Sequence, residues 1–563
     1  MSSGWRVHRA DPRRSDALAQ ALGVHPRTAQ IVLNRGLQGV AEARRFFMPS
    51  LDAGASLPAI PGLVPAVARL RRAIDRREPV LIFSDSDVDG LTASVILYEV
   101  LAGQGGVVRA QPSNRIADGY GFPRAAAQAV ARSRTALVVL VDCGTNQAEE
   151  VQLLMERGID VIVVDHHAPL EAPAQPTVLV NPRATRDAVG QELCSAGLAF
   201  VIARGLLAEE PLERLARYLD LAALGTLADC SPLVGESRVI VAEGLTRILN
   251  SGRSGLRQLC AATKTSEPEP DHILRRLVPR LNASGRLGDA GAVWHLLREG
   301  EDARIERWLA SAESAHAQTK QLYRRVVAEA EGQVQRMHFR DELVVVVSGE
   351  RWHRGLMGPL AAQLAQRYGR PAIAIALEEH HGVGSGRSVP MVNLLDVLRP
   401  CRELLLRFGG HAQACGLTVA RKQLALFRER VNREARLLVG GDGLMATRLI
   451  DLELGLEAMG PSWVKELKQL APFGQGNPRP TILLRGLHVE VRSPRVGVLS
   501  DGTRHVAARG RLSACAAPGR YDVVVSPSGG EGSVVLTVSD ARDAAVPSGL
   551  DRTEGTGCRR GPA

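Results

Sequence analysis

Three acidic side chains occupy alternate positions in the short segment Asp85-Ser-Asp87-Val-Asp89-Gly90. Further acidic groups follow apolar runs later in the chain, at Asp142, at Asp165-His166-His167 and at Asp229. Carboxylates that converge repel one another unless cations neutralise them. Carboxylate oxygens combined with imidazole suit Mn²⁺ or Mg²⁺, whereas zinc more often recruits thiolates. The residue types therefore predict a site for two divalent ions.

Two divalent ions held about 4 Å apart support a specific kind of chemistry. They lower the pKa of a bridging water, and they stabilise the charge that develops in an in-line displacement at phosphorus. A solvated acidic turn would explain one such cluster but is a poor explanation for four. We therefore expect a metal-dependent phosphoester hydrolase.

The first acidic segment also resembles the start of a calcium-binding EF-hand loop. That loop has acidic residues at positions 1, 3 and 5 and Gly at position 6, but it also needs Glu at position 12. Position 12 here is Ile96, and the apolar run 79–83 stands where a helix should precede the loop. The sequence therefore argues against an EF-hand.

The elements that must hold these side chains follow from the apolar pattern. Short apolar runs at 79–83, 136–141 and 161–164 each end next to an acidic cluster, and an amphipathic segment lies at 92–101. Apolar strands that alternate with helices predict a parallel α/β sheet. Ligands collect beyond the carboxyl ends of the strands in such sheets. The three acidic clusters that follow these runs are therefore expected together at one edge of the sheet.

The rest of the chain predicts further domains. A second α/β unit is expected from apolar strands at 343–347 and 372–377, with Gly-rich loops at 382–387 and 409–411. Short β segments at 481–484, 489–491, 522–525 and 534–538 predict a small barrel, plausibly an OB-fold. The expected division is an N-terminal helical extension (1–75), a parallel-sheet domain (76–245), a helical connector (246–338), a second α/β domain (339–440), the OB-fold β-barrel (447–544) and a disordered tail (545–563).

Composition limits the class of protein and of partner. The net charge of +10 favours a polyanionic partner, because each phosphate neutralised by Lys or Arg releases counterions. The eight cysteines form no CxxC pair, which argues against a zinc site or a disulfide framework. No apolar run reaches the roughly 18 residues that span a bilayer. The polar start lacks the apolar centre of a signal peptide, so a cytoplasmic protein without a membrane partner is expected.

The acidic clusters occur in an order that resembles the DHH phosphoesterase superfamily. The matching segments are Asp85–Gly90, Val141–Gly144, Asp165–His167 and Gly225–Asp229. Within the superfamily, the chain is similar to the single-stranded-DNA-specific exonucleases over nearly its whole length. Further matching segments are 33–36, 43–49, 181–182, 193–197, 279–286, 384–388, 407–411 and 472–478. The resemblance implies a DHH domain, a DHH-associated domain and an OB domain at the positions of the three folded domains predicted above.

The resemblance also implies a role for each acidic residue. Asp87 and Asp142 would hold one ion. The other ion would be held by Asp89, Asp142, His166 and Asp229, so that Asp142 bridges the two. His167 would lie beside the scissile phosphate, and Asp85 would support the site.

A further set of residues matches family positions near the nucleic acid: Arg115, Arg280, Arg286, Ser385, Arg387, Ser388 and His411. Arginine donates two parallel hydrogen bonds to phosphate oxygens, and Gly-rich turns expose backbone N–H groups that bind anions. From the residues alone, Arg286 could equally form a salt bridge, and the Gly409-Gly410 pair could be a tight turn.

The sequence departs from the family pattern at a few positions. Ser84 stands where Gly is usual, and Ser86 where Tyr is usual. The run Gly355-Leu-Met-Gly-Pro359 replaces a more regular apolar run. None of these changes removes a metal ligand, but they bear on substrate grip and turnover.

The resemblance implies a 5′-to-3′ exonuclease that degrades single-stranded DNA to 5′-mononucleotides with two Mn²⁺ or Mg²⁺ ions, in recombination and DNA repair. It implies single-strand-binding protein and a recombination helicase as partners, and a monomer is expected. Two alternatives stay open. One is a phosphodiesterase of small nucleotides or oligoribonucleotides, which would not need the barrel. The other is a non-catalytic DNA-binding scaffold, which would not need a complete set of ligands.

Overall fold

The protein, described by a computed structural model, forms two compact units. One unit contains the described residues up to Ser50, the segment Pro232–Val234 and the described residues from Thr447 onward. The other contains the described residues from Leu51 to Ser231 and from Gly235 to Gly440. The expected disordered tail, 545–563, lies outside the described residues. The structure describes residues 4–51, 57–170, 172–298, 302–339, 342–440, 447–515, 517, 519–529 and 532–544.

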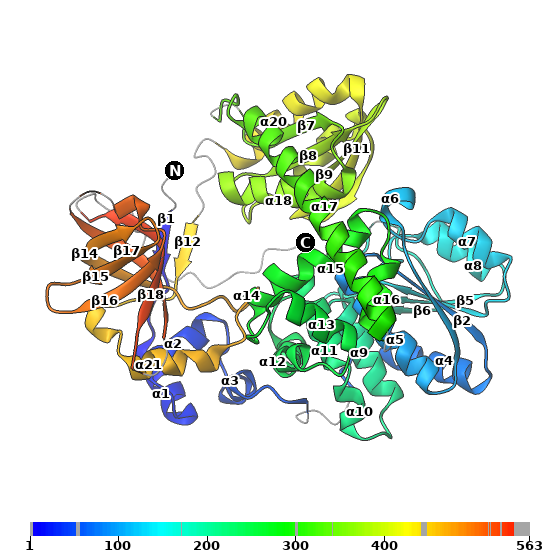
Figure 1. The fold of residues 1–563 in the computed structure, drawn as a ribbon, viewed down its shortest axis with the longest axis horizontal. Coiled ribbons are helices and arrows are strands. Elements are labelled where there is room, and N and C mark those ends of the chain that lie inside the picture. Colours follow the sequence, from blue (N-terminus) through cyan, green and yellow to red (C-terminus); the bar gives the residue numbers. More distant parts are fainter. Residues whose placement is uncertain are drawn as a thin grey trace. The chain divides into compact units, whose positions relative to one another are not determined.

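The first sheet of the larger unit has five parallel strands in the order β3-β2-β4-β5-β6. Its central strands are buried because helices cover both faces. Side chains of α7 (Arg124–Ala131) and α8 (Ala148–Met155) pack on one face, while α4 (Leu63–Asp75) and α5 (Val88–Gly103) lie on the other (Figure 1). The predicted parallel α/β sheet is confirmed. Its strands are β2 (Pro79–Ser84), β3 (Val107–Pro112), β4 (Leu137–Val141), β5 (Asp160–Val164) and β6 (Val178–Val180).

Helix α5 follows β2 and packs against α9 (Ser195–Leu206) and α11 (Leu219–Ala228). Helices α5 and α11 are apolar on almost every side, as expected for helices that other elements surround. This buried group of helices positions the first residues of α5 and α9 and the end of α11 beside the sheet.

A run of helices connects this domain to the second sheet. It includes a five-residue π-helix, η3 (Ile273–Leu277), which leads directly into α15. The 33-residue helix α17 packs on α13, α15 and α16 and reaches the second sheet (Figure 1). The helices are α12 (Gly235–Leu249), α13 (Ser254–Ala262), α14 (Pro270–His272), α15 (Val278–Arg286), α16 (Gly291–Arg298) and α17 (Asp302–Val334).

The second sheet has the order β10-β11-β9-β8-β7, in which β7 and β8 are parallel and the other pairs are antiparallel. Helix α18 (Met357–Tyr368) and the end of α17 pack on one face, and α19 (Leu394–Leu398) and α20 (Leu424–Val439) pack on the other. The second α/β domain is confirmed. Its strands are β7 (Val345–Glu350), β8 (Ala372–Leu377), β9 (His381–Arg387), β10 (Leu405–Gly410) and β11 (Ala414–Ala420).

The smaller unit contains a closed five-stranded barrel, because β14 pairs with both β15 and β17. The OB-fold prediction is confirmed. The segments 481–484 and 489–491, expected as two strands, belong mainly to the single strand β14, whose register shifts near Gly486. That glycine has a φ of 61°, so the strand bends there without ending. The strands are β14 (Ile482–Ser493), β15 (Val496–Ser500), β16 (His505–Gly510), β17 (Arg520–Ser528) and β18 (Val535–Asp543).

The start of the chain packs with this barrel. Helices α1 (Pro12–Leu22), α2 (Pro26–Asn34) and α3 (Val40–Phe47) share one apolar core with the barrel strands. Residues 1–75 were expected to be helical, but the structure adds β1 (Gly4–Val7), which pairs in parallel with β12 (Thr447–Ile450). Four residues carry too little periodicity to reveal a strand whose partner lies more than 400 residues away. None of the described helices combines the length and the apolar character of a membrane span.

Candidate metal centre

The acidic clusters lie together at the carboxyl edge of the first sheet. Asp85 follows β2, Asp142 follows β4 and Asp165 follows β5. Each continues the parallel ladder by one hydrogen bond, since its N–H donates to a carbonyl of the neighbouring strand at 2.9–3.1 Å. Three carboxylates are thereby fixed side by side. This is the arrangement that the apolar pattern predicts.

Helix α5 presents two more carboxylates to the same edge. Asp87 caps the helix and accepts hydrogen bonds from the N–H groups of Asp89 and Gly90 at 3.1 and 3.2 Å. A Cβ at Gly90 would lie 2.7 Å from the Asp85 carbonyl oxygen. The acidic loop can therefore fold this tightly only with glycine at position 90.

The first turn of α9 orients two of these carboxylates. The N–H groups of Ser195 and Ala196 donate to the two oxygens of Asp89 at 2.9 and 2.8 Å. The Ser195 hydroxyl donates to Asp142 Oδ1 at 3.0 Å. Sequence reasoning identified the segment 193–197 but gave Ser195 no role, because only the fold shows which carboxylates the helix faces.

His166 faces three carboxylates with one ring nitrogen. Its Nε2 lies 3.3 Å from Asp142 Oδ1, 3.7 Å from Asp89 Oδ2 and 3.8 Å from Asp229 Oδ1. Ligand atoms that share an ion with bonds of about 2.1 Å lie roughly 3 to 4 Å apart. The separations therefore fit a divalent cation between these four side chains.

The electrostatics of the cluster point the same way. Burial, together with Asp229 and Asp87, raises the pKa of Asp89 to about 7. Burial and the neighbouring carboxylates Asp87 and Asp89 raise the pKa of Asp142 well above its ordinary value. A cation would stabilise the ionised form of these buried carboxylates, because its charge offsets both their desolvation and their mutual repulsion. The donor set, oxygens with one imidazole, suits Mn²⁺ or Mg²⁺.

The structure brings together all the metal ligands that the sequence predicts. Among the residues that the structure describes, ligand atoms within 4.8 Å of one another form three groups, and Asp142 and His166 each belong to two of them. This sharing is what a bridging carboxylate between two ions requires. The groups are Asp85/Asp87/Asp142, Asp142/His166/His167 and Asp89/His166/Asp229.

His167 is held by a carboxylate that sequence reasoning did not assign. Its Nδ1 lies 2.7 Å from Asp165 Oδ1. Burial alone would lower the pKa of His167, but the charge and hydrogen bond of Asp165 outweigh it and raise the pKa. The imidazole ring stacks on that of His411, with centroids 5.7 Å apart and an interplanar angle of 18°. His411 therefore lies next to His167.

Arg115 also lies at the site. Its Nη2 is 2.5 Å from Asp85 Oδ2 and 3.8 Å from Asp87 Oδ2. Asp85 is fully buried and accepts a second hydrogen bond from the Ser113 hydroxyl at 3.3 Å. Asp85 therefore holds Arg115 directly.

Arg286 and Arg387 lie within electrostatic reach of Arg115. Burial, followed by the charge of Arg115, lowers the pKa of Arg286. Burial also lowers the pKa of Arg387, and Arg115 adds to this effect. A Cβ at Gly358 would lie 3.2 Å from Arg387 Nη2 and 3.9 Å from Ser385 Oγ, so this glycine leaves room for both side chains. Cations that repel one another in this way favour a bound anion such as phosphate.

Arg280 and Ser388 already have partners. Arg280 Nε donates to Glu313 at 2.6 Å, and the Ser388 hydroxyl donates to the Val392 carbonyl at 2.6 Å. Arg280 Nη1 also donates to the Arg276 carbonyl at 2.7 Å.

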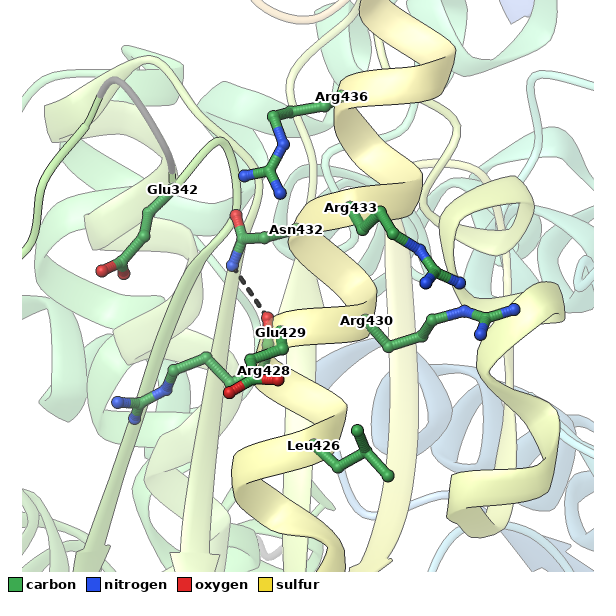
Figure 2. Close-up of a pocket in the computed structure, with 8 residues that line it drawn as sticks. All are labelled: Glu342, Leu426, Arg428, Glu429, Arg430, Asn432, Arg433 and Arg436. Carbon is green, nitrogen blue, oxygen red and sulfur yellow. Dashed lines mark hydrogen bonds between the residues drawn. The ribbon is translucent and has the colours of Figure 1, made fainter.

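An open groove of about 480 Å³ lies elsewhere in the larger unit, along α20 (Figure 2). None of the acidic ligands contributes to its wall, so the chemistry described above does not belong to it. The groove is lined by Glu342, Leu426, Arg428, Glu429, Arg430, Asn432, Arg433 and Arg436.

Three sequence models of known families match the chain. They are the DHH family, N-terminal domain, at residues 79–226, the DHHA1 domain at 341–436 and the RecJ OB domain at 450–508. A solved structure, RecJ of Thermus thermophilus in complex with Mn²⁺, superposes with a TM-score of 0.83 at 28% identity, covering 97% of this chain and 80% of that one. The cluster of acidic side chains thus lies in a fold for which a manganese-bound crystal structure, that of the Thermus protein, has been solved.

Curated relatives of similar sequence carry the same family name. The single-stranded-DNA-specific exonuclease RecJ of Bacillus subtilis is 31% identical, over 86% of this chain and 62% of the relative. RecJ of Thermus thermophilus is 32% identical over 90% of this chain and 72% of the relative, and RecJ of Dickeya dadantii is 32% identical over 80% and 82%. The chain spans about three fifths of the Bacillus protein and more of the other two. The chain therefore belongs to the RecJ family of single-stranded-DNA-specific exonucleases.

Proposed function

We propose that this protein is a 5′-to-3′ exonuclease that hydrolyses single-stranded DNA to 5′-mononucleotides with two divalent metal ions. The observation that carries the proposal is the sharing of Asp142 between two groups of ligand atoms, next to His167 and Arg115. Family membership supports single-stranded DNA as the substrate. The polarity rests on the family resemblance.

The residues present fit two ions of Mn²⁺ or Mg²⁺. Asp87 and Asp142 would hold one ion, and Asp89, Asp142, His166 and Asp229 would hold the other. When bound, such ions activate water and neutralise charge at the phosphate.

The protein's own side chains bind and orient the substrate. Asp165 holds His167 through Nδ1, and in its imidazolium form, which has a proton on each ring nitrogen, His167 donates a hydrogen bond from Nε2 to a phosphate oxygen. Arg115, itself oriented by Asp85, pairs with a phosphate. Further DNA contacts are proposed for Arg286, Ser385, Arg387 and His411. Arg280 and Ser388 are also proposed to contact DNA. Arg280 donates to protein partners through Nε and Nη1 and offers Nη2 besides, whereas the Ser388 hydroxyl would exchange the Val392 carbonyl for a phosphate oxygen.

The OB domain is proposed to hold more distant nucleotides of the same strand. By the family resemblance, we also propose a cytoplasmic monomer that acts in recombination and DNA repair. Single-strand-binding protein and a recombination helicase are its proposed partners.

The direct test uses single-stranded oligonucleotides labelled at the 5′ or the 3′ end, incubated with purified protein and Mn²⁺. The proposal expects early release of the 5′ label as a mononucleotide and stepwise shortening of the 3′-labelled strand. Asp142→Ala should abolish both, whereas Asp75→Ala, which removes a carboxylate at the end of α4, away from the site, should not.

Other results would favour the alternatives. Hydrolysis of dinucleotides with both labels left intact on the long strand would indicate a phosphodiesterase of small nucleotides. Binding of the oligonucleotide without hydrolysis in Mn²⁺ or Mg²⁺ would indicate a non-catalytic scaffold.

A further inference from the structure

Tyr120 lies at the metal centre although neither the sequence motifs nor the proposed mechanism assigns it a role. It follows α6 (Arg115–Asp118) and stands between Gly119, with a φ of 82°, and Gly121, with a φ of 95°. A Cβ at Gly121 would lie 1.7 Å from Gln147 Nε2. The two glycines give this loop a backbone path that other residues rarely adopt. The loop carries the phenol to the edge where β4 and β5 end.

The phenol hydroxyl contacts two residues of the site. It donates a hydrogen bond to the backbone carbonyl of Asp142 at 3.1 Å, and its oxygen lies 3.0 Å from His167 Nδ1. The backbone of Asp142 has a φ of 60°, in the left-handed region that few residues other than glycine adopt. The hydroxyl thus holds the proposed bridging carboxylate by its main chain and reaches the proposed phosphate-binding histidine at the same time.

These contacts fix the His167 ring in place. The Tyr120 proton goes to the Asp142 carbonyl, so the phenol oxygen can act only as an acceptor toward His167. That oxygen lies 3.0 Å from Nδ1 and 3.4 Å from Nε2 of the ring, whereas Asp165 Oδ1 lies 2.7 Å from Nδ1. Asp165 therefore keeps a proton on Nδ1, and the phenol oxygen limits how far the ring can turn.

The ring of Tyr120 has contacts of its own. The Arg115 guanidinium carbon lies 5.3 Å from the ring centroid, within cation–π range. The ring also meets His167 edge to face, with centroids 5.4 Å apart. His167 is therefore in contact with Tyr120 and with His411, whose ring stacks on it. One side chain joins the arginine and the histidine that are proposed to hold phosphate.

We propose that Tyr120 is a positioning residue with two separable parts. Its hydroxyl orients the His167 ring and supports the main chain of Asp142, which serves the chemical step. Its ring holds the guanidinium of Arg115, which serves DNA binding. This inference rests on the proposed exonuclease function for its first part, but the second part concerns binding alone.

Two substitutions separate the parts. Tyr120→Phe removes the hydroxyl and keeps the ring, and Tyr120→Leu removes both. Loss of a residue that orients an active-site side chain costs about 10- to 100-fold in activity. For Tyr120→Phe we expect kcat to fall by this factor, while KM and the Kd for single-stranded DNA, measured in chelator without metal, stay within about twofold. For Tyr120→Leu we expect the same loss of kcat with a rise of both KM and Kd.

Tyr368→Phe is the matched control, because it removes a phenol hydroxyl on α18 whose ring packs against Phe339. It should leave kcat, KM and Kd unchanged. A Tyr120→Phe variant with wild-type kcat would overturn the role of the hydroxyl. A Tyr120→Leu variant with unchanged Kd would overturn the role of the ring.

The DNA-binding measurement tests the role of the Tyr120 ring even if the proposed exonuclease function is wrong. If wild-type protein hydrolyses no DNA, the exonuclease proposal fails, and the metal-free Kd of the two variants still decides the role of the ring. If Tyr120→Leu does not fold, as judged by circular dichroism, the kcat of Tyr120→Phe decides the role of the hydroxyl.

Discussion

The Ser195 hydroxyl donates a hydrogen bond of 3.0 Å to Asp142 Oδ1, the carboxylate that two groups of ligand atoms share. The N–H of the same serine donates to Asp89 Oδ2 at 2.9 Å. One residue at the start of α9 therefore fixes two carboxylates from different elements: Asp89 in the first turn of α5 and Asp142 directly after β4. Partners of this kind orient ligands before any ion binds.

Ser195→Ala should weaken metal binding without removing a ligand. Because the substitution deletes only the bond to Asp142 and keeps the backbone bond to Asp89, we expect Mn²⁺ affinity to fall by about 10- to 100-fold. Calorimetric titration of the metal-free protein with Mn²⁺ measures this directly. Ser133→Ala serves as the control, since that hydroxyl bonds the Val130 carbonyl at the end of α7. Equal affinities for wild type and Ser195→Ala would show that Asp142 needs no such support.

Divalent ions should stabilise the folded protein. An ion that binds only the native state contributes about 2.7 kcal/mol at a concentration of 100 times its Kd. Burial and mutual repulsion raise the pKa values of Asp89 and Asp142, so ionised carboxylates at these positions destabilise the fold and a cation would offset this. We expect Mn²⁺ to raise the melting temperature of wild-type protein and of Asp75→Ala, and to have little effect on Asp142→Ala. A wild-type melting curve that Mn²⁺ does not shift would contradict the metal site.

The positions of the acidic residues were predictable because each short apolar run in the sequence shows where a strand of the parallel sheet ends. Asp142 and Asp165 follow apolar runs directly, and the sheet order then places them side by side. Their roles as ligands stay predictions until an ion is bound.

Residues that orient the ligands were not predictable in the same way. Ser195 meets Asp89 across 106 residues, and Tyr120 meets His167 across 47. No local periodicity encodes such contacts, which depend on how separate elements pack. Arg115, five residues before Tyr120, and the segment 193–197 were recognised as matches to a family, but the match does not show which atoms meet. Similarly, the continuous strand β14 depends on Gly486, which interrupts the alternation of apolar residues without ending the strand.

Gly225→Ala should damage both stability and metal binding. A Cβ at position 225 would lie 2.4 Å from both Thr92 Oγ1 and Ala196 Cβ, and 3.2 Å from Asp89 Oδ1. Helix α11, which carries Gly225, would have to move away from α5 and α9, at a cost of roughly 1–3 kcal/mol in the free energy of unfolding. Urea denaturation and Mn²⁺ titration measure the two effects.

Gly103→Ala is the matched control for this substitution. Position 103 is the last residue of α5, and a Cβ there meets nothing within 4 Å. Replacing an unstrained glycine by alanine stabilises a protein by about 0.4–1 kcal/mol, because the unfolded chain loses freedom. The two substitutions are therefore expected to change the unfolding free energy in opposite directions. A Gly225→Ala protein as stable as wild type, with unchanged Mn²⁺ affinity, would show that α5 and α9 adjust freely.

Binding of single-stranded DNA should depend steeply on salt, and Arg387 should account for part of the dependence. For single strands, each phosphate contact adds about −0.7 to the slope of log K against log salt concentration. Arg387 is partly buried near Arg115, with a pKa lowered chiefly by burial, so a phosphate would relieve the repulsion between the two cations. We expect Arg387→Gln to make the slope shallower by about 0.7 in metal-free protein, measured by fluorescence anisotropy. Arg399→Gln removes an exposed arginine that pairs with Asp396 at 2.8 Å, and it should keep the wild-type slope. If both variants keep the wild-type slope, Arg387 does not contact phosphate, and the neutralising contacts must come from other arginines.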